Sequence, residues 1–156
     1  MSEPTSRHPD DHETMVGFFT DDDWYPEEQA EGIIGMRFHG ENGEWGCFAE
    51  ARRPPGQFLF YSVLTPVVPE EDLLRMAELL TWVNELLLVG NFELDLSSGQ
   101  VRFKTSIALG DEPLTAGLVR ASAYLNVTTM DRCLPLLLTL IETNETPEQI
   151  ASMLTS

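Results

Sequence analysis

Basic side chains are scarce in this sequence of 156 residues. Lysine and arginine together number 9 against 26 aspartates and glutamates, so the formal net charge is −17. Such a chain is repelled by nucleic-acid phosphates and by anionic lipid headgroups, which excludes both as expected partners. The simplest interpretation is a cytoplasmic protein that its charge keeps apart from its neighbours. A protein partner with a basic surface is the alternative.

Cysteine is also rare, and long apolar runs are missing. Cys47 and Cys133 are far apart and form no CxxC motif, so we expect neither a disulfide framework nor a zinc site, but two buried free thiols. No stretch is long and apolar enough to span a bilayer, and the first eleven residues lack the apolar core of a signal peptide. These absences favour a cytoplasmic location.

Catalytic motifs are lacking as well. The chain has no G-x-S-x-G elbow and no phosphate-binding loop. Its three histidines, His8, His12 and His39, are not spaced as metal ligands. We therefore expect a protein that is not an enzyme, with no catalytic residue, no metal and no cofactor.

One acidic cluster offers a different possibility. It consists of Asp21, Asp22, Asp23, Glu27 and Glu28. The cluster lacks the alternating oxygen ligands and central glycine of an EF-hand loop, and nothing predicts the burial that a catalytic carboxylate pair needs. A solvated acidic loop is the expected state. The alternatives are a carboxylate- or metal-dependent enzyme that uses this cluster, and a sensor of a small ligand.

Hydrophobic spacing and turn residues predict an α+β fold with antiparallel hairpins, because short turns join the strands within each group. A flexible tail is expected over residues 1–11, and one domain over residues 12–156. The expected elements are a short helix over 12–22, a three-strand meander over 31–39, 44–52 and 57–65, a long helix over 69–89, a hairpin over 91–96 and 100–109, and C-terminal helices beginning near 114, 128 and 146. The strand over 57–65 is apolar on both faces, which predicts a central strand or one whose second face meets a partner.

The long helix over 69–89 has two apolar sides. The first is expected to pack on the sheet, with Asn84 tying the helix to a nearby backbone; it contains Leu73, Met76, Ala77, Leu80 and Leu87. The second side contains Leu79, Trp82 and Leu86. Either the N-terminal segment or the C-terminal helices cover these three residues, or they form a protein interface, in a homodimer or with a client.

Several short motifs resemble the YbjN family of bacterial proteins. They are Asn84, the segments 90–95 and 99–103, and the closing segment 146–151; order and spacing agree from about Met15 to Ala151. The resemblance implies a fold similar to that of type III secretion chaperones, which are small, acidic, usually dimeric proteins that bind extended client segments. The family is described loosely as regulators of sensory transduction, and no catalytic residue is attached to it.

The sequence therefore predicts a non-enzymatic protein-interaction module, chaperone-like or regulatory, that forms a homodimer. A client would add to a sheet edge or place apolar side chains in grooves beside a helix. Leu79, Trp82 and Leu86 are the predicted interface residues.

Overall fold

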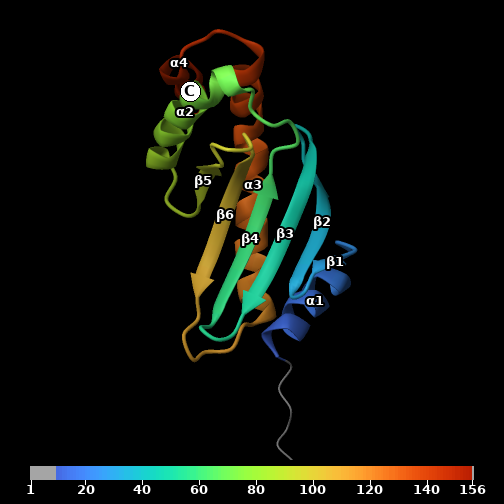
Figure 1. Cartoon of the computed structure of the whole chain (residues 1–156). Coiled ribbons are helices and arrows are strands. Elements are labelled where there is room, and N and C mark those ends of the chain that lie inside the picture. The colour runs from blue at the N-terminus through green and yellow to red at the C-terminus, as the bar shows by residue number, and fades with distance from the viewer. Residues whose placement is uncertain (1–9, 156) are drawn as a thin grey trace, which may run out of the picture.

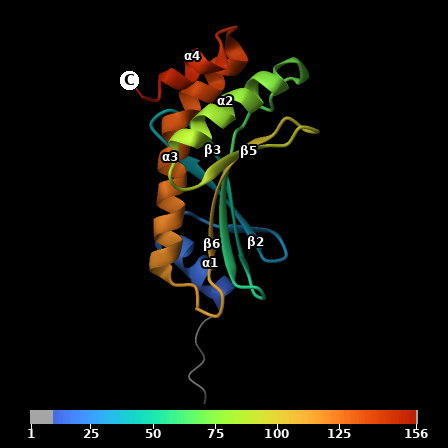
Figure 2. The same ribbon diagram turned by 90° about the vertical axis from the view of Figure 1, so that its left-hand side faces the viewer.

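The computed structural model describes residues 10–155, which form one antiparallel sheet with all helices on one side or at one end (Figures 1 and 2). The elements are α1 (Asp11–Asp21), β1 (Glu27–Ala30), β2 (Ile33–His39), β3 (Glu44–Arg52), β4 (Gln57–Val63), a 3-10 turn (Glu70–Asp72), α2 (Leu73–Leu86), β5 (Asn91–Leu94), β6 (Val101–Ala108), α3 (Ala116–Glu142) and α4 (Pro147–Ser152). The predicted α+β class is confirmed.

The sheet has six strands in the order β1-β2-β3-β4-β6-β5, and every pairing is antiparallel. β4 lies between β3 and β6, so the prediction of a central strand over 57–65 is confirmed. The meander has four strands rather than the predicted three. The missed strand, β1, reads Glu-Glu-Gln-Ala and is exposed throughout, so it has no apolar alternation that a sequence pattern would reveal.

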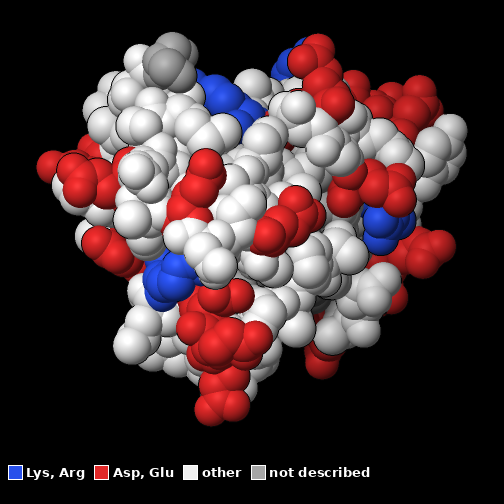
Figure 3. Space-filling model, turned by 90° about the horizontal axis from the view of Figure 1, so that it is seen from above, with Lys and Arg blue, Asp and Glu red and all other residues white. Residues whose placement is uncertain are grey.

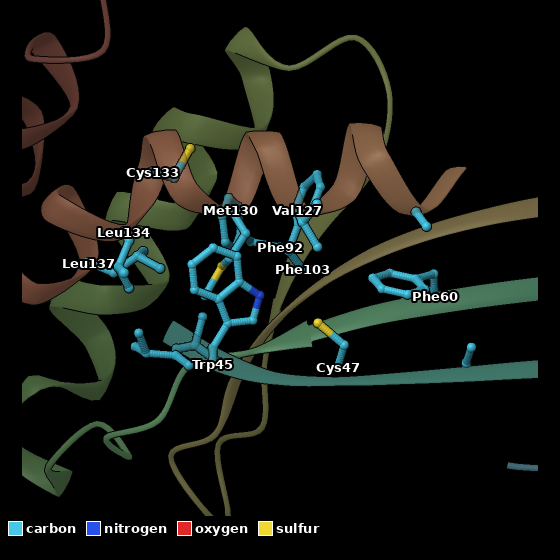
Figure 4. Packing of buried hydrophobic residues seen from close by; sticks show 14 of the residues in the cluster. Trp45, Cys47, Phe60, Phe92, Phe103, Val127, Met130, Cys133, Leu134 and Leu137 are labelled. Carbon is cyan, nitrogen blue, oxygen red and sulfur yellow. The ribbon is translucent and has the colours of Figure 1, made fainter. Parts of the chain in front are cut away.

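The long helix α3 and the short helix α1 pack on one face of the sheet, and α3 contributes more buried hydrophobic residues than any other helix. Phe60 and Phe103 from the strands meet Val127 and Met130 from the helix, all of them fully buried (Figure 4). The prediction of two helices beginning near 114 and 128 is wrong, because α3 is continuous over 27 residues. Buried packing of the polar and β-branched residues near its middle overrides their weak helix propensity.

Asn126 explains why this middle segment stays helical. Its Nδ2 donates to the backbone oxygens of Phe60 and Phe103, at 3.0 Å each, and its Oδ1 accepts from Ser62 Oγ at 2.6 Å. Ser62 in turn accepts from Trp45 Nε1 at 2.8 Å. These buried bonds join the helix to three strands, and the helix cannot break at Asn126 without losing them.

Pro135 lies inside α3 and leaves the backbone oxygen of Asp131 without its usual helical donor, because proline has no N–H. Asn42 replaces that donor, with Nδ2 lying 3.0 Å from the oxygen of Asp131. The Asp131 carboxylate accepts from the backbone N–H groups of Glu41 and Asn42 at 3.0 and 2.8 Å. The turn between β2 and β3 is thereby fixed to the helix at the proline.

The α2 helix ends at Leu86, three residues earlier than predicted. Asn84 binds both backbone groups of Phe92 in β5, accepting from its N–H at 2.7 Å and donating to its oxygen at 3.2 Å. The expected tie to a backbone is present. Gly90 has φ of +79°, and a Cβ there would lie 2.6 Å from the Phe103 ring, so the chain needs glycine where it turns into β5.

The packing face of α2 also differs from the prediction. Its buried residues are Met76, Leu79, Leu80 and Val83, and α2 packs mainly against β5 and α4 rather than on the face of the sheet. Arg75 extends from the same helix to the carboxyl end of α3, donating to the backbone oxygens of Leu140, Thr143 and Glu145. The predicted start of the last helix at Thr146 is confirmed as a capping box with Gln149.

Asp10 and Asp11 lie within the predicted tail but form contacts with the fold. Asp10 caps α1, and Asp11 is buried and accepts from the Leu114 backbone N–H at 3.0 Å and from Arg53 Nε at 2.8 Å. These two residues belong to the fold, which corrects the predicted tail over 1–11. The rest of that tail, residues 1–9, lies outside the described residues. Between residues 10 and 155 we find no helix with the length and apolarity needed to cross a membrane.

Candidate interaction surfaces

The three residues predicted to form an interface do not share one environment. Leu79 is fully buried within this chain, so it belongs to the core. Trp82 and Leu86 are 38% and 47% exposed. They are followed by Leu88, which is fully exposed, and by Val89. The exposed apolar surface at the end of α2 therefore comprises Trp82, Leu86, Leu88 and Val89; we call it the helix-end surface.

A second surface lies where β5 leaves half of β6 uncovered. β5 pairs with β6 only as far as Lys104, whereas β6 continues to Ala108 beside β4. Within the described residues, the segment from Thr105 to Ala108 has no strand on its β5 side. A hollow of about 200 Å³ borders this segment. Its lining is largely apolar and includes Val89, Ile107, Leu118, Ala121 and Leu125. We call this region the β6 edge.

A third surface is the open face of the sheet, opposite α3 (Figure 2). β4 directs Phe58 and Phe60 into the core and Leu59, Tyr61 and Val63 toward the open face, where they are half-buried. A hollow of about 310 Å³ lies on this face. Its lining includes Ile33, Phe48, Tyr61, Val63 and Arg102. Sequence reasoning anticipated the two-sided strand, but not the neighbours that complete this hollow.

The acidic cluster is divided by the structure. Asp22 is structural: it accepts hydrogen bonds from the Tyr124 hydroxyl and from Trp24 Nε1, which lower the pKa of its carboxyl group. The side chains of Asp21, Asp23, Glu27 and Glu28 are exposed. Among residues 10–155, no group of three or more potential ligands is placed to hold a metal ion.

A hollow of about 590 Å³ does bring Asp23 and Glu27 to the same cavity as His39. It is open to solvent, and His39 Nδ1 lies 2.8 Å from a carboxylate oxygen of Glu44. Acid–base work needs buried carboxylates whose pKa values are separated, and Asp23 and Glu27 face water. The cavity is better suited to binding than to catalysis.

The two thiols are unsuited to nucleophilic chemistry. Cys47 and Cys133 are free and buried, as predicted. Burial raises the pKa of Cys47 to about 12 and that of Cys133 to about 11. Because the thiolate is the reactive form, neither residue is activated at neutral pH.

Acidic side chains dominate the end of the molecule formed by α2 and α4, with few basic ones among them (Figure 3). The open face differs, because its four basic side chains pair with three glutamates, of which Glu93 binds two. The ion pairs are Arg37–Glu44, Arg52–Glu50, Arg102–Glu93 and Lys104–Glu93. Charge is thus distributed unevenly over a chain whose net charge is −17.

Comparison with known proteins gives a consistent result. No curated protein matches the chain. The crystal structure of YbjN from E. coli, described as “a putative transcription regulator”, is similar with a TM-score of 0.58 and 12% sequence identity, over 81% of this chain and 88% of that chain. At this identity the likeness shows the fold alone. The YbjN family, described as “Putative bacterial sensory transduction regulator”, matches residues 11–138. The resemblance seen in the sequence is confirmed, and the chain belongs to the YbjN family.

Proposed function

We propose that this chain is a non-enzymatic regulatory protein that acts by binding protein, and that the β6 edge is its working surface. The observation that carries the proposal is the unpaired half of β6 beside an apolar hollow. In strand addition, backbone hydrogen bonds supply affinity and side-chain pockets supply specificity, and this edge offers both. The description of the family as regulators supports the regulatory role.

The hydrogen-bonding pattern indicates which residues would receive a strand. The backbone N–H and oxygen of Phe92 are both hydrogen-bonded to the side chain of Asn84. Phe92 is therefore not hydrogen-bonded to Phe103, the residue opposite it on β6. Hydrogen-bonded pairs alternate along an antiparallel ladder, so the backbone groups of Lys104 point toward β5. By the same alternation, those of Ser106 and Ala108 point toward the open edge.

The occupant we propose is a second copy of the chain. A two-fold axis at Ile107 places Ser106 of one copy opposite Ala108 of the other, and both residues present their backbone groups to the partner. The four resulting hydrogen bonds contribute about 2–6 kcal/mol net. Association costs about 4–15 kcal/mol, so the apolar hollow must supply the remainder and the dimer is expected to be weak. Two acidic chains repel each other, so added salt should strengthen the dimer.

Sedimentation velocity over about 5–500 μM, at low and high salt, tests this proposal. Kd values in this range correspond to binding free energies of about 4.5–7 kcal/mol in magnitude. The wild-type chain should show concentration-dependent dimerisation that salt favours. Leu118→Lys places a charge in the hollow and should abolish the dimer. Leu74→Lys is the matched control, because Leu74 is 82% exposed near the start of α2, away from the β6 edge. A strictly monomeric wild type would refute dimerisation, and equal effects of the two variants would refute the assignment to this edge.

The helix-end surface is the alternative interface, and the same experiment includes it. Trp82→Glu should leave a β6-edge dimer unchanged, because Trp82 does not line the hollow. Loss of the dimer with Trp82→Glu, but not with Leu118→Lys, would assign the interface to Trp82 and Leu86 instead.

A further inference from the structure

The open face of the sheet is more apolar than an exposed antiparallel face usually is. Such faces normally carry polar side chains at alternate positions. β4 instead presents Leu59, Tyr61 and Val63, and Tyr61 lies directly opposite Phe48 of β3. Phe48 is 36% exposed. No helix within residues 10–155 packs on this side (Figure 2).

Two adjoining hollows shape this face. The apolar hollow of about 310 Å³ and the larger one of about 590 Å³ share Gln29 and Phe48 in their linings. Gly35 and Gly46 are among the residues that line the larger hollow. The Gln29 side chain covers Gly35, because a Cβ there would lie 2.8 Å from Gln29 Cγ. A Cβ added at Gly46 would meet nothing within 4 Å, so this position is open space. Phe48 therefore forms a ridge between an apolar hollow and a more polar one.

The charges in the two hollows differ. Arg102 borders the apolar hollow, but it is paired with Glu93 at 3.0 Å, and its guanidinium lies 5.1 Å from the centre of the Tyr61 ring. Asp23, Glu27 and Arg37 border the larger hollow. Arg37 is paired with Glu44 at 3.5 Å, whereas neither Asp23 nor Glu27 forms an ion pair with another described residue. The uncompensated charge on this side of the molecule is negative, so its complement is an apolar group next to a basic one.

We infer that the open face is a docking surface for a basic, amphipathic helix of another protein. Its apolar stripe would cover Phe48 and Tyr61, and its flanking lysines or arginines would face Asp23 and Glu27. A helix about 10–12 Å wide covers roughly two strand spacings of about 4.8 Å. Centred over β3 and β4, it leaves β1, which is two spacings from β3, to be reached by its long basic side chains. A second copy of the chain fits poorly, because its basic side chains on this face are already paired.

This inference rests on the proposed function only in that the chain acts by binding protein; it uses a different surface from the β6 edge. Salt separates the two, because ionic screening weakens attraction to a basic partner and strengthens association of two acidic copies. Added salt should therefore strengthen the dimer and weaken binding of the basic helix, which distinguishes the two proposals.

The test uses the full chain and a synthetic peptide of about four helical turns, with leucines on one face and lysines on the other. Isothermal titration should show saturable equimolar binding that weakens with salt, and NMR shifts should centre on Phe48 and Tyr61. Peptides with glutamate in place of lysine, or serine in place of leucine, should bind at least tenfold more weakly.

Matched variants decide whether the face itself is recognised. Phe48→Ser and Glu27→Lys should each weaken peptide binding about tenfold or more. Glu148→Lys makes the same charge change at an exposed position of α4 and should have a much smaller effect. No binding, or equal losses with Glu27→Lys and Glu148→Lys, would overturn the inference, since the latter indicates diffuse charge attraction. The dimerisation assay is scored separately, so failure of one proposal does not conceal the other.

Discussion

Asn126 allows a quantitative test of how the helix is held to the sheet. Its side chain is fully buried and hydrogen-bonded to two backbone oxygens and to the hydroxyls of Ser62 and Thr105. Replacing Asn126 by alanine removes four neutral hydrogen bonds. Three of them share the two hydrogens of Nδ2, so together the four are worth about 3 kcal/mol net. The smaller side chain also leaves unfilled space in the core. The expected loss in the free energy of unfolding is about 3–4 kcal/mol, a large part of the roughly 5–15 kcal/mol typical of a domain.

Urea unfolding of Asn126→Ala, Ser62→Ala and the double variant measures this contribution. Each single variant leaves the other side chain with an unpaired polar group, so the double variant should cost less than the sum of the singles by about 1 kcal/mol or more. Asn144→Ala is the control, because Asn144 is exposed and should change stability by less than about 0.5 kcal/mol. A loss below about 1 kcal/mol for Asn126→Ala, or simple additivity, would refute the argument.

Two further predictions concern contacts of α3. Asn42→Ala should cost about 0.5–1.5 kcal/mol in urea unfolding, because the backbone oxygen of Asp131 loses its protein donor at an exposed site. Pro135→Ala should reduce that cost by restoring a helical N–H, and failure to do so would refute this account of the proline. Tyr124→Phe should cost about 1 kcal/mol at pH 7 by removing the hydrogen bond that holds the pKa of Asp22 low. Because a lowered folded pKa contributes stability above the unfolded value of about 3.9, the wild-type advantage should disappear as the pH falls through the folded pKa; a pH-independent difference would contradict this assignment.

Local signals predicted much of the fold. Alternating apolar residues and turn residues located five of the six strands, and Asn84 was correctly expected to bind a backbone. Signals of this kind work where one segment determines its own structure. β1 was missed because it is an exposed strand held by pairing with β2. The continuity of α3 was missed because it depends on partners of Asn126 that lie far away in the sequence.

The candidate surfaces were harder to predict for the same reason. For Leu79 the sequence left two possibilities open, an interface or cover by another part of the chain. The structure places Leu79 in the core, and α4 packs against α2. The apolar hollow on the open face combines residues from β2, β3, β4 and β6, and their register sets its position. The one signal in the sequence that indicated this surface was the segment 57–65, which is apolar on both faces of the predicted strand.

The amide of Asn84 has a consequence for how many copies of the chain can assemble. The Asn84 amide forms hydrogen bonds to the outward-facing N–H and oxygen of Phe92, so these groups are not free to pair with a further strand beside β5. The opposite edge strand, β1, is short and carries Glu27 and Glu28, which discourage strand pairing. Strand addition would then be confined to the β6 edge, and the two-fold contact proposed there uses the same edge of both copies. A dimer of this kind would close at two chains, so the sheet would not extend into a fibre.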